Sequence, residues 1–172
     1  MNLAVGAAVV YGAHGVGRVT VREQRTLHDE PTDVVVVALE DGLTVTLPLS
    51  QALEQLRPVA DQQELLRIEK TLRVDRELSP APWLGRRNEL QRKLGAADPV
   101  QLAEIVVEGA QREQRRLAAG NKQPLSPGER GVFMKARKIL ADEIAVARGT
   151  DQPGAEAWIE EQLARPEGPS RD

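Results

Sequence analysis

The chain has 172 residues, of which 41% are apolar and 28% are charged, and its formal net charge is −3, which suits one domain or two small ones. The absence of cysteine excludes disulfides, thiolate zinc sites and cysteine nucleophiles, and the two histidines, His14 and His28, offer little for a metal or acid–base centre. The N-terminal stretch lacks the basic segment of a signal peptide and no apolar run approaches the roughly 20 residues of a membrane span, so we expect a cytoplasmic protein without a cofactor.

Residues 3–58 have the pattern of short β-strands separated by turns. The segments "AAVVYG", "GRVTVREQRTL", "DVVVVALE" and "LTVTLPL" are rich in β-branched residues, and Val19 and Val21 alternate with polar neighbours, which is the period of a half-buried strand. Asp41-Gly42 between two such segments predicts a hairpin. Four or five short strands in this space predict a small SH3-like barrel.

From Asp61 onward the apolar spacing changes to that of helices. Asp61 and Glu64 have the spacing of a capping box, and Asp98-Pro99 and Ser126-Pro127 repeat the start signal of a helix. The predicted helices begin near Asp61, Trp83, Asp98, Ser126 and Pro153. We therefore predict an α+β chain, with a β-barrel module at 1–58, an all-α bundle of about five helices at 59–165 and a disordered tail at 166–172.

No set of residues has the spacing of an enzyme centre. The glycine-rich "YGAHGVGRV" is not followed by Lys-Ser/Thr or by a helix, so it predicts a tight turn and not a phosphate loop. Adjacent carboxylates such as Asp142/Glu143 and Glu160/Glu161 point about 100° apart on a helix and do not converge on one atom. We therefore expect no enzyme.

The segment "SPAPWLGRRNELQRKL", residues 79–94, combines an aromatic residue with positive charge. Pro80 and Pro82 keep the chain extended, so Trp83 begins the following helix. Four cations lie close after it: Arg86, Arg87, Arg92 and Lys93. Two interpretations follow. Trp83 either covers the end of the helical bundle, or it is an exposed apolar wedge that enters a DNA minor groove while the cations hold phosphates.

The order of these segments resembles that of a known family. The resemblance rests on "VVYGAHGVGRV", "LTVTLP", "PWLGRRNELQRKL", "DPVQLAEIVVEGAQREQ" and "LSPGERGVFMKARKILADEIA". Across nearly its full length, the chain resembles the CarD/CdnL family of bacterial transcription regulators. The β module also resembles the polymerase-interacting domain of transcription-repair coupling factors.

The resemblance implies a mechanism and a set of contacts. A Tudor-like N-terminal module binds the β1 lobe of the RNA polymerase β subunit, with Arg25 and Thr46 at positions of the polymerase contact. The helical domain reaches promoter DNA at the upstream edge of the −10 element, independently of sequence. There Trp83 wedges into the minor groove, with Arg86, Arg87, Arg92 and Lys93 near the phosphates, and stabilises the open complex. We expect a monomer that acts without catalysis.

Three positions depart from the family pattern. Gly85 stands where an arginine commonly follows the tryptophan, Thr46 stands where members commonly carry a second arginine, and Gly12 replaces a usual proline. These departures leave a second hypothesis open. In that hypothesis the chain is a divergent paralogue, a protein-interaction module that binds polymerase or another protein without touching DNA.

Overall fold

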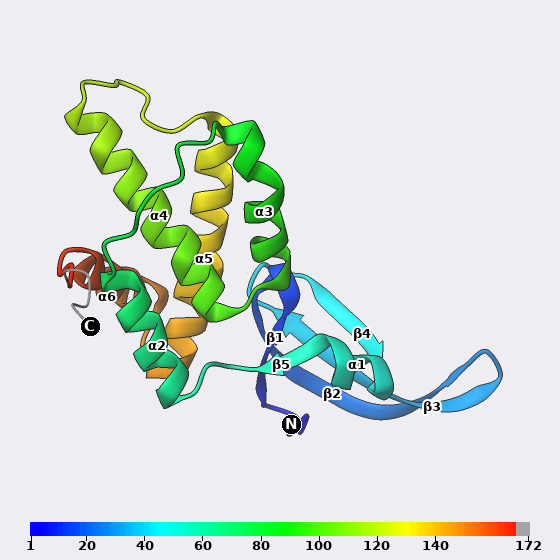
Figure 1. Ribbon diagram of the computed structural model, residues 1–172. Coiled ribbons are helices and arrows are strands. Elements are labelled where there is room, and N and C mark those ends of the chain that lie inside the picture. Colours follow the sequence, from blue (N-terminus) through cyan, green and yellow to red (C-terminus); the bar gives the residue numbers. More distant parts are fainter. Residues whose placement is uncertain (168–172) are drawn as a thin grey trace. The chain divides into compact units, whose positions relative to one another are not determined.

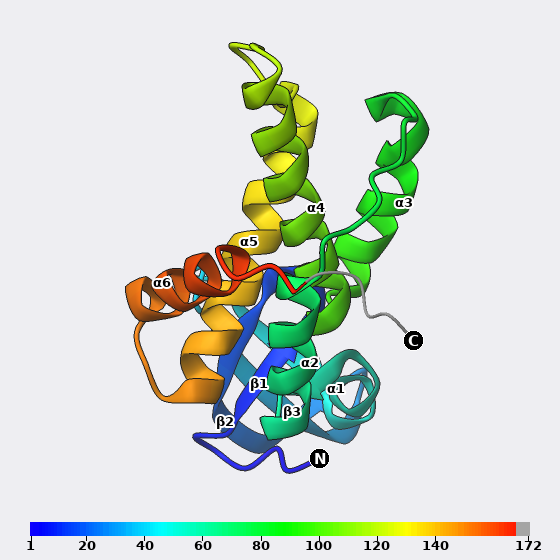
Figure 2. The same cartoon turned by 60° about the vertical axis from the view of Figure 1, so that its left-hand side comes forward.

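A computed structural model describes residues 1–167 of the chain (Figures 1 and 2). The chain divides into two compact units, Met1–Val59 and a second unit that begins at Ala60. Of the predicted tail, residues 168–172 lie outside the described residues, whereas Glu167 donates its backbone N–H to the carbonyl of Arg73 at 2.7 Å. No helix within residues 1–167 combines the length and the apolar character needed to cross a membrane.

The first unit is a five-stranded sheet with the strand order β4-β3-β2-β1-β5, in which every neighbouring pair is antiparallel (Figure 1). Its strands are β1 (Ala8–Tyr11), β2 (Val16–Leu27), β3 (Glu30–Leu39), β4 (Thr44–Pro48) and β5 (Leu56–Pro58). A 3₁₀ turn, η1 (Gly12–His14), connects β1 to β2, and a short helix, α1 (Leu49–Gln55), connects β4 to β5. The glycine-rich "YGAHG" is thus a turn, as predicted.

Side-chain alternation builds the core of this sheet. Val35, Val37 and Leu39 of β3 lie on one face and pack with Val19 of β2 and Leu47 of β4. Consecutive residues of a strand point to opposite faces, so the remaining positions of β3 belong to the other face.

Two tight turns set the register of the long strands. His28 and Asp29 join β2 to β3 with φ angles of 52° and 65°, the left-handed pair that matches the twist of a two-residue hairpin. Gly42, with a φ of 88°, turns β3 into β4, which confirms the hairpin predicted at Asp41-Gly42.

The predicted barrel is wrong in one respect, because the sheet does not close. Within the described residues, β4 and β5 are the two edges of the sheet and do not pair with each other. The unpredicted helix α1 lies between them in sequence, contacts β3, β4 and β5, and buries Ala52 completely in the core. A helix therefore covers the apolar face, so strand closure is not needed to bury it.

The second unit contains α2 (Gln62–Arg73), α3 (Trp83–Ala96), α4 (Pro99–Ala118), α5 (Pro127–Arg148) and α6 (Gln152–Leu163). Asp61 and Glu64 form the predicted capping box, and Ser126 with Glu129 forms a second one at the predicted helix start. Asp98 also caps its helix, α4, with its side chain. With α1, the described residues contain six α-helices, whereas about five were predicted.

The long helices α4 and α5 form the centre of this unit. α4 packs against α2, α3 and α5, and α5 also contacts α3 and α6 (Figure 2). The two central helices approach closely where Gly109 of α4 meets the ring of Phe133 of α5: a Cβ atom at residue 109 would lie 2.3 Å from the ring atom Cδ2. The resulting apolar core leaves the first turn of α3 at its margin, where Trp83 is partly buried.

Candidate nucleic-acid interface at the first turn of α3

The segment between α2 and α3 is irregular and is held by polar side chains of α4. Gln111 donates to the carbonyl of Val74 at 2.8 Å and accepts from the backbone N–H of Arg76 at 3.0 Å. Arg112, the next residue on α4, donates to the carbonyl of Ser79 at 3.1 Å. These bonds satisfy backbone groups that have no helix or sheet partner, and they lead the chain to the start of α3 in a defined path.

Trp83 is the first residue of α3 and is held on two sides. Its ring packs against the apolar core on one side and lies against Gly128 in the first turn of α5 on another. The guanidinium of Arg86, one turn later on α3, lies 5.9 Å from the ring centroid, within cation–π range. The side chain is therefore neither fully covered nor free to rotate, and the structure combines features of both interpretations of Trp83.

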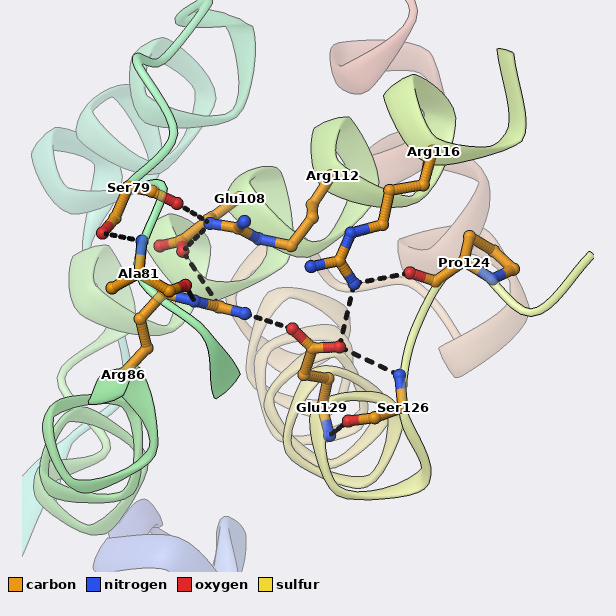
Figure 3. Close-up of polar contacts among 9 residues, drawn as sticks. All are labelled: Ser79, Ala81, Arg86, Glu108, Arg112, Arg116, Pro124, Ser126 and Glu129. Carbon is orange, nitrogen blue, oxygen red and sulfur yellow. Dashed lines mark hydrogen bonds and ion pairs between the residues drawn. The ribbon is translucent and has the colours of Figure 1, made fainter. Parts of the chain in front are cut away.

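Arg86 lies inside the protein, and only 8% of its side chain is exposed. Its polar contacts are drawn in Figure 3. It donates from Nε to the carbonyl of Ala81 at 2.9 Å, lies 3.6 Å from a carboxylate oxygen of Glu108 and pairs with Glu129. Arg116 donates to the other oxygen of Glu129 at 3.0 Å. We name these five residues, Arg86, Glu108, Arg112, Arg116 and Glu129, the ion cluster; Arg112 joins it through Glu108 at 3.2 Å.

Glu129 combines two functions in this cluster. It closes the capping box of α5, because its carboxylate accepts from the backbone N–H of Ser126 at 2.9 Å while its own N–H bonds to the serine hydroxyl. Burial by itself would raise the pKa of the Glu129 carboxyl, but the Ser126 N–H and the guanidinium groups of Arg86 and Arg116 outweigh burial and lower that pKa from 4.5 to about 2. Glu129 is therefore a fixed negative charge at neutral pH.

The four cations predicted to contact DNA have different surroundings. Arg87 is exposed and has no ion-pair partner within residues 1–167. Arg92 is exposed but is bound by Glu89, and the nitrogen Nζ of Lys93 lies 2.8 Å from Glu104 on α4. The hydrogen bond between Glu89 and Arg92 lowers the pKa of Glu89 and raises the pKa of Arg92. Arg86 is committed to the ion cluster, so its predicted phosphate contact is not available in this arrangement.

Other exposed residues of the helical unit were missed from the sequence. Leu84 is 74% exposed, the largest fraction among the large apolar side chains of the described chain, although it directly follows Trp83. Arg130 and Lys135 on α5 are exposed and have no ion-pair partner in the described part of the chain. Lys135 lies seven residues after Gly128, on nearly the same helical face about 10 Å further along. Sequence spacing alone did not find these cations, since they lie on a different helix from Trp83.

The start of α3 also differs from the starts of the other helices in this unit. Pro82 is its N-cap and supplies no side-chain hydrogen bond. The starts of α2, α4, α5 and α6 each have a side-chain cap. The N–H groups of this first turn, which no side chain caps, and the helix dipole add a partial positive charge to the edge that carries Arg87.

In the first unit, the two residues predicted to contact polymerase lie on one face of the sheet. Arg25 of β2 is opposite Thr32 of β3, and Thr46 of β4 is opposite Val36 of β3. Thr32 and Val36 are four residues apart on one strand, so Arg25 and Thr46 share a face and lie roughly 15 Å apart. Arg25 is half exposed and pairs with Glu23 on the same strand.

Together these features define a class of two-part binding protein. One unit offers a sheet with exposed polar residues, and the other offers a supported aromatic residue beside free cations. Among residues 1–167, no group of three or more His, Cys, Asp or Glu side chains is placed to hold a metal ion. The geometry is suited to contact with other macromolecules.

Comparison with family models identifies the family. Residues 3–60 match the CarD-like/TRCF RID domain, and residues 67–160 match the C-terminal domain of CarD. The chain therefore belongs to the CarD family, which confirms the resemblance seen in the sequence. The domains of this family are those of transcription regulators that interact with RNA polymerase and are not enzymes.

Proposed function

We propose that this chain binds the β1 lobe of the RNA polymerase β subunit through its first unit and stabilises the open promoter complex through Trp83. In this proposal Trp83 enters the minor groove at the upstream edge of the −10 element. The observation that carries the proposal is the support of Trp83 at the margin of the helical core, next to exposed Leu84 and Arg87.

The chemistry of this edge suits a distorted minor groove. Apolar side chains that enter a minor groove part a base step at a cost of a few kcal/mol, and the cost is smaller where the step is already melting. A preference of about 1.4 kcal/mol for the open state shifts the ratio of open to closed complex about tenfold. Trp83 and Leu84 together offer the apolar surface for such a contact, and the effect needs no catalytic group.

The free cations suit the flanking phosphates. Arg87 and Lys135 are exposed without ion-pair partners in the described residues, and phosphate contacts of this kind carry no sequence information. We therefore propose DNA binding that is independent of sequence and weakens with added salt. The net charge of −3 is compatible with this role, because polymerase binding supplies a high local concentration and intrinsic affinity can be low.

The face of the sheet that contains Arg25 and Thr46 is the proposed polymerase contact. Its two marker positions, Arg25 and Thr46, lie on the same face roughly 15 Å apart, a distance that a single partner surface can span. Capture of wild-type protein by the β1 lobe, with loss of capture in Arg25→Glu, tests this part. We propose a monomer that acts on polymerase in the cytoplasm without a cofactor.

The test of the wedge compares the two tryptophans of the chain. Trp83→Ala is expected to shorten the lifetime of the open complex about tenfold, which corresponds to the 1.4 kcal/mol considered above. Trp158→Ala is the matched control, because Trp158 is also partly buried against the same core and also lies under an arginine. Equal lifetimes for wild type and Trp83→Ala, with both proteins folded and bound to polymerase, would refute the wedge.

A second candidate function has one observation in its favour. Arg86, Arg92 and Lys93 are all ion-paired within the protein, so α3 offers less free charge than its sequence suggests. In this alternative the helical unit binds a protein and does not touch DNA. Fluorescence of Trp83 in a Trp158→Phe background separates the two: it changes on adding forked promoter DNA to the polymerase complex only if the indole meets the DNA.

A further inference from the structure

The first turn of α5 contains a glycine that no backbone requirement explains. Gly128 lies inside the helix and is not among the glycines with positive φ, so alanine would satisfy its backbone and would form helix better. Yet a Cβ atom at residue 128 would lie 2.7 Å from Nε1 and 3.0 Å from Cε2 of Trp83. The absent side chain therefore makes room for the indole.

Glu129, the next residue, is connected to the Trp83 ring through a buried arginine. Glu129 pairs with Arg86, and the guanidinium of Arg86 lies 5.9 Å from the centroid of the Trp83 ring. Arg86 is also bonded to the carbonyl of Ala81, two residues before Trp83 in the chain. The Arg86–Glu129 pair therefore links the first turn of α5 to the Trp83 ring and to the backbone at Ala81.

We propose that the first turn of α5 positions Trp83 for its contact. Gly128 sets how closely the indole lies against α5, and Glu129 holds Arg86 beside the ring. Both are positioning residues and neither touches the partner. The biological meaning of this inference rests on the proposed function, since a ring that is held in place before binding loses little freedom when it inserts.

The neighbouring Gly131 supplies a matched control. It lies one turn after Gly128 on the same exposed part of α5, and nothing lies within 4 Å of a Cβ atom built on it. Gly128→Ala and Gly131→Ala therefore add the same methyl group and the same helix propensity. They differ in that the first methyl group meets Trp83 and the second meets open space.

The experiment measures acrylamide quenching of Trp83 in the full-length Trp158→Phe protein. We expect Gly128→Ala to change the quenching constant and to shorten the open-complex lifetime roughly threefold, because the indole is displaced. We expect Gly131→Ala to match its parent in both measurements. Identical quenching constants for the two alanine variants would overturn the inference.

A second pair of variants tests the contribution of Glu129. Glu129→Gln keeps an oxygen that caps α5 but removes the charge that holds Arg86, whereas Ser126→Ala weakens the cap and leaves the ion pair. Quenching that changes in Glu129→Gln and not in Ser126→Ala supports the inference, and the reverse pattern overturns it. The open-complex lifetime with Trp83→Ala tests the wedge separately from the positioning of the ring. A lifetime equal to that of wild type would refute the wedge, whereas the quenching measurements still decide whether α5 positions Trp83.

Discussion

The surroundings of the two tryptophans differ in one informative way. Trp83 and Trp158 are both partly buried against the same core, and each has an arginine near its ring, Arg86 at 5.9 Å and Arg148 at 5.0 Å. Arg86 is buried and bound to two glutamates, whereas Arg148 is exposed and has no ion-pair partner in the described residues.

This difference shows how an aromatic residue at the margin of a core is given a defined pose. At Trp158, burial of apolar surface is enough, because that residue has only to attach α6 to the bundle. At Trp83 the chain adds buried charges. These charges are costly to desolvate, but they hold the side chains around the ring in one specific geometry.

Removal of the central carboxylate should have the largest effect. Glu129→Gln leaves Arg86 buried with Glu108 as its remaining carboxylate partner, and we expect it to lower the free energy of unfolding by about 3–4 kcal/mol. Urea unfolding followed by far-UV circular dichroism measures this loss. A loss below about 1 kcal/mol would show that the cluster contributes no more than surface ion pairs do.

Acid should remove the same contribution. The pKa of Glu129 is lowered from 4.5 in the unfolded chain to about 2 in the folded protein, so its stabilisation is complete above pH 4.5 and is lost as the pH falls towards 2. The shift corresponds to at most roughly 3 kcal/mol. The difference in unfolding free energy between wild type and Glu129→Gln should therefore shrink over this range. A constant difference would contradict the assignment.

The arginine beside Trp158 should matter less. Arg148→Ala removes an exposed cation–π contact, and we expect a loss of about 0.5–1 kcal/mol in the free energy of unfolding. The open-complex lifetime should stay at the wild-type value. An effect as large as that of Glu129→Gln would remove the distinction between the two tryptophan sites.

Leu84 should give the smallest change in stability and a measurable change in function. Because its side chain is 74% exposed, Leu84→Ala should alter the free energy of unfolding by less than about 0.5 kcal/mol. Loss of its contact with DNA should shorten the open-complex lifetime about twofold, since a few apolar atoms are removed. Leu66→Ala, at an exposed position of α2, is the control and should have no effect.

Much of the fold follows from local signals in the sequence. The capping box at Asp61, the helix start at Ser126 and the turn at Asp41-Gly42 depend on residues a few positions apart, and all three are present as predicted. The barrel prediction failed because strand patterning shows that an apolar face must be covered but does not show what covers it. In this protein α1 covers that face.

The candidate site was only partly predictable. Position and composition indicated Trp83 and its nearby cations, and Arg87 is indeed exposed beside it. The sequence did not reveal that Arg86 lies inside, because its carboxylate partners Glu108 and Glu129 are on other helices and are distant in the chain. Arg130 and Lys135 were overlooked because they lie on α5, distant in the chain from Trp83.

The amino-acid sequence by itself determined the family and the starts of the five helices of the second unit, and it indicated the candidate site at Trp83, because these depend on periodicity, capping and motifs within short stretches. Only the tertiary structure decided which cations are free and what supports Trp83. Those properties depend on which side chains from α3, α4 and α5 meet, and burial or pairing of a charge is set by its neighbours in space.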